Sequence, residues 1–297
     1  MTDSAPTAFH DGERRAQALA AVAPPSSTFI RPFMPEQHRR FFAALPYVVL
    51  GTLSDGGWPV ATFATGHPGF LSSPDETTLL LTWDPPPGDP VANAISPGSS
   101  IAILGIEFAT RRRNRANGIV LSSGAGATCI RVLQSFGNCP QYIRAREAKP
   151  LHRTPGPAER LSALDAAARR LITAATTLFV ASCAPSIVHG GMDVSHRGGP
   201  AGFVRIDGDV LTVPDYPGNR YFNTFGNLIE NPRAGLLFVD FGSGDLLHVA
   251  GDASVSWNGA ERSFSLRIRD IVRQRAALPL GWIERPEVNA SASARQG

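Results

Sequence analysis

Asn219, Arg220 and Asn223 are the residues whose types and spacing most clearly suggest chemistry in this 297-residue chain. They follow a turn-forming run, Pro214 to Gly218, and open a segment with the character of a short helix. Arginine offers a planar fork of donors, and the start of a helix offers free backbone N–H groups. This combination predicts a cradle for a phosphate. The alternative is a plain helix start with an arginine on the surface.

A second polar group, Ser195-His196-Arg197, lies in a turn ahead of an apolar strand. His196 could donate a proton to a bound ligand, although a lone histidine in a loop is more often only solvated. It is the weak candidate for a catalytic residue.

A third group is the basic run Arg111-Arg112-Arg113-Asn114-Arg115. Alternate side chains of a strand point to opposite faces, so Arg111, Arg113 and Arg115 would share one side. From that side they could reach an anionic ligand. The alternative is a solvated basic edge strand.

Short strands and tight turns must position these groups. Alternating apolar residues predict strands at 202–206 and 210–213, joined by the turn Asp207-Gly208-Asp209. A helix after residue 219 should end at Asn231-Pro232, because proline cannot continue it. The remaining pattern predicts a mainly β fold with a few helices. The predicted helices are 35–45, 91–95 and 156–176, and the main predicted strands are 47–53, 58–65, 78–82, 101–108, 178–183, 234–241 and 264–272.

The order of elements in the first half is repeated in the second. Val239-Asp240-Phe241 is similar to Ile106-Glu107-Phe108, and a glycine follows each triplet at the same distance. We therefore expect repeats at 29–150 and 151–285, preceded by a loosely held arm at 1–28 with one or two helical turns and followed by a flexible tail at 286–297. When the two repeats are aligned on these triplets, the predicted phosphate donors of the second repeat fall opposite prolines of the first, where Asp84–Pro90 reads DPPPGDP.

Three motifs give the chain a family resemblance: DVSHRGG at 193–199, LTVPDYPGNRYFNTFGNL at 211–228 and ENPRAGLLFVDF at 230–241. With them the sequence resembles the FMN-binding split-barrel family, which includes pyridoxamine 5′-phosphate oxidase, and most of all its oxidase-related members. The resemblance implies two tandem split β-barrels that form a pseudo-dimer within one chain, with FMN bound non-covalently between them. Further dimerisation is open. The cofactor contacts that it implies are Ser195, Arg197, Val213, Pro214, Asn219, Arg220 and Asn223, with Arg111, Arg113 and Asn114 from the first repeat.

The expected function is that of an FMN-dependent oxidoreductase acting on a small planar substrate. NAD(P)H or a separate reductase would supply electrons, and no GxGxxG motif indicates a dinucleotide site. One alternative is a non-catalytic flavin-binding or stress protein. Another is a haem or deazaflavin enzyme on the same fold, for which a haem would need an axial histidine: His67, His189, His196 or His248.

Cys139 lies in a third family-like run, FGNCPQY, which resembles a segment leading into a helix. A helix start would lower the thiol pKa, but a structural thiol is the favoured interpretation. The three cysteines form no CxxC pair and no metal-binding spacing, so no metal is expected.

Composition excludes several classes of protein. A net charge of +3 is too small to predict nucleic-acid binding. No apolar run is long enough to cross a bilayer, and the N-terminus lacks the apolar core of a secretory signal. These features predict a cytoplasmic protein with no membrane partner.

Overall fold

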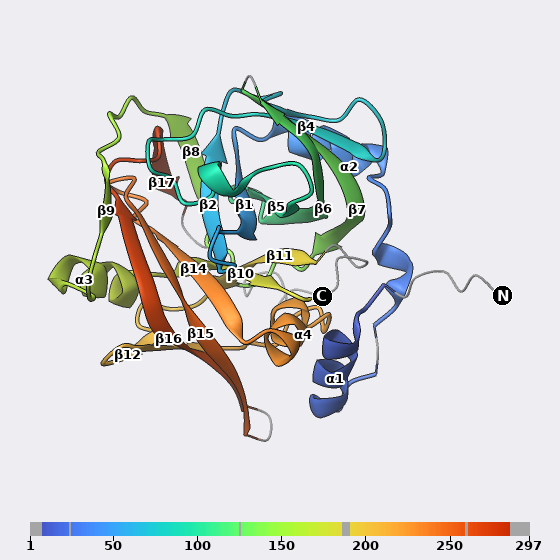
Figure 1. Ribbon diagram of the computed structural model, residues 1–297. Coiled ribbons are helices and arrows are strands. Elements are labelled where there is room, and N and C mark those ends of the chain that lie inside the picture. Colours follow the sequence, from blue (N-terminus) through green and yellow to red (C-terminus); the bar gives the residue numbers. More distant parts are fainter. Residues whose placement is uncertain (1–7, 24, 125, 186–190, 259–260, 286–297) are drawn as a thin grey trace, which may run out of the picture.

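The computed structural model describes residues 8–23, 25–124, 126–185, 191–258 and 261–285, and it is built mainly of antiparallel strands (Figure 1). The first half forms a seven-stranded sheet in the order β2-β1-β5-β6-β7-β4-β3. Its strands are β1 (Tyr47–Leu53), β2 (Pro59–Thr65), β3 (Leu71–Ser72), β4 (Thr78–Thr82), β5 (Ser100–Glu107), β6 (Arg112–Gly124) and β7 (Ala127–Asn138).

The second half forms a sheet in the order β11-β10-β14-β15-β16-β13-β12, with β9 added on β16. Raising each strand number of the first sheet by nine reproduces this order. The strands are β9 (Ala158–Arg160), β10 (Thr177–Cys183), β11 (Met192–Gly198), β12 (Arg205–Asp207), β13 (Val210–Pro214), β14 (Arg233–Val239), β15 (Leu246–Asn258) and β16 (Glu261–Gln274).

A third, two-stranded sheet joins the halves. It pairs β8 (Arg146–Pro150), which follows the first sheet in the chain, with β17 (Leu280–Glu284), which follows the second. Each half therefore contributes one strand to a shared element.

The inner faces of the two large sheets pack against each other. One buried cluster takes Tyr47, Val49 and Phe63 from β1 and β2, and Phe179 and Val194 from β10 and β11. The rings of Phe63 and Phe179 meet edge to face, with centroids 5.3 Å apart. Separate clusters fill the outer side of each sheet. The contact between the halves is thus a continuous apolar core.

In the described part of the chain, four α-helices lie around the sheets: α1 (Asp11–Leu19), α2 (Glu36–Ala44), α3 (Ala166–Ala174) and α4 (Asn223–Glu230). The helix expected at 35–45 is confirmed by α2. The helix expected at 156–176 is too long, because Ala158–Arg160 pairs with β16 as a strand. The side chain of Asp165 then caps α3 by accepting a hydrogen bond from Ala168 N at 2.8 Å. Among the described residues no helix is long and apolar enough to cross a membrane.

The N-terminal arm is more ordered than its composition suggested. Its helix α1 packs beside α4 of the second half (Figure 1). Phe9, just before α1, is buried against Tyr221 and Phe136. The described part of the arm is therefore attached to the body of the protein.

Candidate functional site

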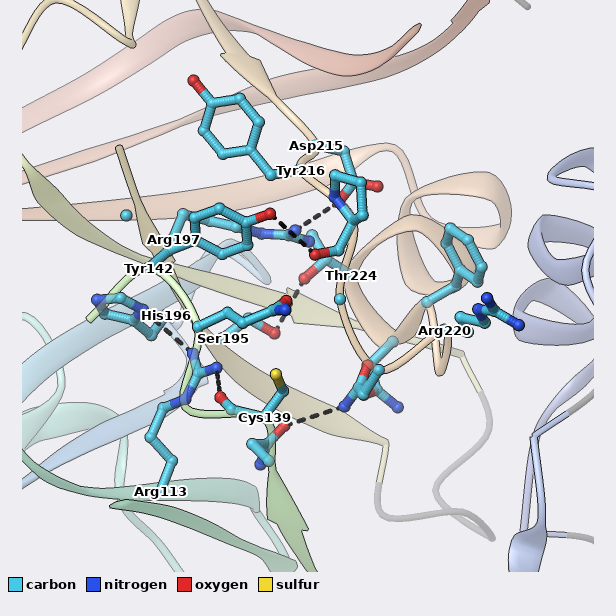
Figure 2. A pocket seen from close by; sticks show the side chains of 18 of the residues that line it. Arg113, Cys139, Tyr142, Ser195, His196, Arg197, Asp215, Tyr216, Arg220 and Thr224 are labelled. Carbon is cyan, nitrogen blue, oxygen red and sulfur yellow. Dashed lines mark hydrogen bonds and ion pairs between the residues drawn. The ribbon is translucent and has the colours of Figure 1, made fainter. Parts of the chain in front are cut away.

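A cavity of about 440 Å³ opens between β6 of the first sheet, β11 of the second, and the loop from β13 to α4 (Figure 2). This volume is in the range of small-molecule and cofactor sites. The first half provides Arg113 and Arg115 on β6, Asn138 at the end of β7, and Cys139 and Tyr142 in the turn that follows. The second half provides Ser195, His196, Arg197, Pro214, Asp215, Tyr216, Asn219, Arg220, Asn223, Thr224 and Arg262.

The lining carries a surplus of positive charge, with five arginines and one aspartate. Asp215 is shared by two of these arginines: its Oδ1 pairs with Arg197 Nη1, and its Oδ2 accepts from Arg262 Nε at 2.9 Å. One carboxylate therefore offsets only one of the two charges beside it. An anion is the ligand that this wall would favour.

Arg115 ties the two halves together beneath the cavity. Its Nη1 donates to Asp193 Oδ1 at 2.9 Å and to Asn223 Oδ1 at 3.0 Å, and its Nη2 donates to Ser195 Oγ at 2.9 Å. Thr224 Oγ1 donates to the same Ser195 oxygen at 3.0 Å. Burial lowers the pKa of the Arg115 guanidinium, and the Asp193 carboxylate opposes that shift. A buried, paired charge of this kind holds its neighbours in fixed positions.

His196 is held neutral. Arg113 Nη1 donates to His196 Nδ1 at 3.1 Å, so the ring proton lies on Nε2. Burial, with Arg113 and Arg197 nearby, keeps the pKa of His196 well below its usual value. Its Nε2 is buried without a hydrogen-bond partner, and Phe108 and Phe179 pack on the ring. A neutral ring of this kind has no imidazolium proton to transfer, but its Nε2–H has no partner among the described residues and can donate a hydrogen bond to a ligand.

The loop before α4 has an unusual backbone. Arg220 and Phe222 have φ angles of 63° and 59°, in the left-handed region. The helix therefore begins at Asn223 and not at residue 219. Arg220 is exposed at the edge of the cavity and makes no hydrogen bond or ion pair with other described residues (Figure 2). Its guanidinium is thus free for a ligand.

Two tyrosines of the wall, Tyr142 and Tyr216, lie in the family-like motifs but were not predicted as site residues. The rings of Tyr142 and Tyr216 lie 5.3 Å apart at 30°. Tyr142 OH donates to Pro217 O at 3.1 Å. The Tyr142 carbonyl approaches β11 so closely that a Cβ at Gly198 would lie 1.9 Å from it. A glycine at that position lets the two halves meet at this side of the cavity.

Three of the residues implied by the resemblance lie outside the cavity. Arg111 has a φ of 59° in the turn before β6, so it does not continue the alternation of Arg113 and Arg115. Asn114 is on β6 but points to the opposite side of the strand from those two arginines, as alternation requires. Val213 is fully buried in the core of the second sheet.

Cys139 lies in the cavity wall but not at a helix start. The strand β7 ends at Asn138, a turn follows, and β8 begins at Arg146. Arg113 Nη2 donates to the Cys139 carbonyl, and the cysteine is partly exposed. The expected helix after this cysteine is therefore wrong.

Several donors at the cavity wall have no protein partner. Among the described residues they are Arg113 Nε, Arg115 Nε, Asn138 Nδ2, His196 Nε2 and Arg197 Nε. Buried donors are normally satisfied, and groups left unpaired mark places where a ligand or water completes the bonding. With the free guanidinium of Arg220, these donors fit a ligand that has both a phosphate and a polar planar ring, as FMN has.

The histidines fit a haem poorly. His248 is bonded at both ring nitrogens, to Ala61 O at 2.8 Å and to Gln274 Oε1 at 3.1 Å. His196 accepts from Arg113, and His67 is exposed outside the cavity lining. His189 lies outside the described residues. Because His196 Nε2 carries the ring proton, no described histidine offers an unprotonated, unbonded ring nitrogen to the cavity. Nor do the described residues contain a cluster of three or more histidine, cysteine, aspartate or glutamate side chains that could hold a metal ion.

Comparisons with known proteins give limited matches. No curated protein matches the sequence. Among solved structures, an FAD-binding protein from Mesorhizobium loti is 15% identical, covering 40% of this chain and 97% of its own, with a TM-score of 0.31. General Stress Protein 26 from Bacillus anthracis is 12% identical, covering 39% and 95%, with a TM-score of 0.28. The haem storage protein HutZ from Vibrio cholerae is 12% identical, covering 41% and 94%, with a TM-score of 0.28. In sequence, residues 164–284, which include β11, α4 and the loop that carries Arg220, match the pyridoxamine 5′-phosphate oxidase family.

Proposed function

We propose that the chain binds FMN non-covalently in the cavity and acts as an FMN-dependent oxidoreductase. The observation that carries this proposal is the set of five arginines and one aspartate on walls drawn from both halves. FMN brings a phosphate that carries close to two negative charges at neutral pH. The family match over residues 164–284 supports the same choice of ligand.

Different residues of the cavity wall would bind the phosphate and the ring of FMN. Arg220, exposed and without a partner among the described residues, would take the phosphate together with Asn219 and Asn223. Arg113 would place a fixed positive charge near the ring. Burial lowers its pKa to about 10, so it remains protonated at neutral pH. Tyr142 and Tyr216 would cover the site and exclude water. Bound FMN would supply hydride or electron transfer to a small planar substrate.

We also infer that the two halves are tandem repeats of one split barrel that form a pseudo-dimer. The matching strand order of the two sheets supports this inference. So does the shared sheet of β8 and β17, in which corresponding strands of the two halves pair. A site between repeats explains why Arg113 and Arg115 of one half face Ser195 and Arg197 of the other.

A haem-dependent function is not favoured, because the described histidines offer no unprotonated, unbonded nitrogen to the cavity. A non-catalytic flavin binder would share the cavity and differ only in turnover. Mixing FMN-loaded protein with NAD(P)H, and then with oxygen or a quinone, separates these two functions. Turnover faster than that of free FMN supports an enzyme.

Binding itself is tested with purified protein. We expect flavin absorption bands and release of FMN, not FAD, on denaturation. In apoprotein, Arg113→Leu should weaken FMN binding at least tenfold, because a buried charge-assisted contact is worth roughly 1.5–3 kcal/mol. Arg112→Leu is the matched control, since that neighbouring arginine is exposed and lies outside the lining. No flavin bands, together with no FMN binding by the apoprotein, would overturn the proposal.

A further inference from the structure

The helix α1 touches α4 backbone to backbone (Figure 1). A Cβ at Gly12 would lie 2.3 Å from the Gly226 carbonyl oxygen, and a Cβ at Gly226 would lie 2.5 Å from Glu13 N. Both distances are below any real Cβ contact, so only glycine fits on either side. The two helices therefore form a close, specific contact, although more than 200 residues of chain separate them.

Polar groups of α1 complete the contact. His10 Nε2 donates to Asn227 Oδ1 at 2.9 Å, and Gly12 N donates to Glu230 Oε1 at 2.7 Å. Polar bonds buried at this depth specify one position of α1 on α4, because a shifted helix would leave them unpaired.

Glu13 links this contact to the cavity. It is only 3% exposed, and its Oε1 accepts a hydrogen bond from Asn223 Nδ2. The same Asn223 side chain accepts from Arg115 Nη1 at 3.0 Å, and both residues line the cavity. Farther along the arm, Val22 lines the cavity as well. The N-terminal segment therefore reaches the site both directly and through Asn223.

The charge around Glu13 favours a neutral carboxyl. Burial raises the pKa of Glu13 to about 8, and the Asp193 carboxylate of β11 adds to the shift. Arg115 of β6 acts in the opposite direction, as do the hydrogen bonds from Asn223 and from the His10 backbone. Glu230 of α4 lies at the same contact, 3.4 Å from His10 Nδ1.

We propose that residues 8–22 form a docking strap that is part of the FMN site, and that Glu13 is the positioning residue of this strap. With its carboxyl neutral, Glu13 holds Asn223 in place against Arg115. Docking of α1 then orders the α4 end of the cavity, and ligand binding in turn favours docking, since the two equilibria are linked. The proposal rests on the proposed function in taking FMN as the ligand.

The first test undocks the strap. Gly12→Ala places a methyl group against Gly226 while it raises helix propensity, so a loss of docking cannot come from a weaker helix. We expect faster amide hydrogen exchange across α1 and about tenfold weaker FMN binding, as when one well-placed hydrogen bond is lost. Gly124→Ala is the matched control, because its Cβ would meet nothing within 4 Å.

The second test uses pH and needs no flavin. The pKa of Glu13 is 4.5 in its ordinary state and about 8 when α1 is docked, so the docked state binds the proton more tightly. Docking should therefore weaken as the pH rises from 4.5 towards 8. Protection of α1 from exchange, corrected for intrinsic rates, should therefore fall by up to tenfold per pH unit in the parent protein. Glu13→Gln mimics the neutral acid, so its protection should stay flat. Glu13→Ala should lose protection at every pH.

The outcomes separate the two proposals. If the parent protein does not bind FMN, the proposed function fails. If the parent protein binds FMN, but Gly12→Ala and Glu13→Ala bind it equally tightly, the strap is not part of the site. If added FMN leaves the protection of α1 unchanged in the parent protein, the linkage is absent and the strap proposal is wrong.

Discussion

Arg113 and His196 join the two halves of the molecule through one hydrogen bond, from Nη1 to Nδ1 at 3.1 Å. The arginine comes from β6 and the histidine from β11, so the bond crosses the wall of the cavity (Figure 2). It fixes the tautomer of the imidazole, and the neutral ring adds no third positive charge beside Arg113 and Arg197.

The first prediction concerns acid stability. The pKa of His196 is lowered on folding, so the unfolded chain binds more protons below about pH 6.5. The contribution of His196 to the free energy of unfolding should therefore fall by up to about 1.4 kcal/mol per pH unit as the pH drops below 6.5. Comparing the free energies of unfolding of the parent protein and His196→Asn at pH 7 and pH 5 measures the effect.

Asparagine is a useful replacement because its Oδ1 can still accept the bond from Arg113. The variant should lose less stability between the two pH values, even if it is less stable at both. The other histidines are common to both proteins and cancel. Equal losses in the two proteins would show that His196 titrates normally.

The second prediction concerns Arg220. Replacement by alanine should weaken FMN binding by about ten- to a hundred-fold, because a charge-assisted phosphate contact is worth roughly 1.5–3 kcal/mol. The side chain is exposed, so the free energy of unfolding of the apoprotein should change little. Titration of apoprotein with FMN, followed by fluorescence quenching, checks the first statement, and urea unfolding checks the second.

Arg205→Ala removes an exposed arginine on β12, outside the cavity, and serves as the control. Arg220→Lys keeps the charge but loses the planar fork, so its affinity should lie between those of the parent and the alanine variant. Unchanged binding by Arg220→Ala would mean that the phosphate lies elsewhere in the cavity.

Local patterns predicted much of the site. Alternation along one strand placed Arg113 and Arg115 together, and both line the cavity. The same rule failed for Arg111, because the chain turns there through a left-handed residue, and strand alternation cannot anticipate a turn. The polar loop residues Asn219 and Arg220 line the same cavity as Ser195.

Other residues of the wall could not be found from the sequence. Arg262 reaches the cavity only because β16 pairs with β13 and so places it beside Asp215. Tyr142 meets Tyr216 across the boundary between the halves. These contacts depend on tertiary pairing, which no short-range pattern contains. The docking of the arm could not be predicted for the same reason, since the partner of α1 is a helix far along the chain.

The third prediction tests how tightly the halves interlock. A Cβ at Gly51 of β1 would lie 2.2 Å from Val194 Cγ2 of β11. Gly51→Ala should therefore destabilise the protein by about 1–3 kcal/mol through overpacking. Val194→Ala removes the clashing methyl groups, so the double variant should be less destabilised than the sum of the two single variants. A double-mutant cycle from urea unfolding measures the coupling, and a coupling of zero would argue against this contact.

The last prediction is that one chain binds one FMN. In the first half the positions that correspond to the site are filled by the protein itself. Thr62 faces Leu50 as Ser195 faces Val180, and Thr62 Oγ1 donates to a buried carboxylate, that of Asp89, at 2.5 Å. An anion there would meet a carboxylate and not an arginine.

The strand position of Arg115 is likewise changed in the other half. His248 faces Leu237 as Arg115 faces Leu104, and both its ring nitrogens are already bonded. The space beside His248, Ala61 and Pro90 is only about 20 Å³, little more than one water molecule needs. Flavin released per mole of saturated chain should therefore approach one. A ratio near two would show that the first half also binds FMN and that Asp89 does not close its site.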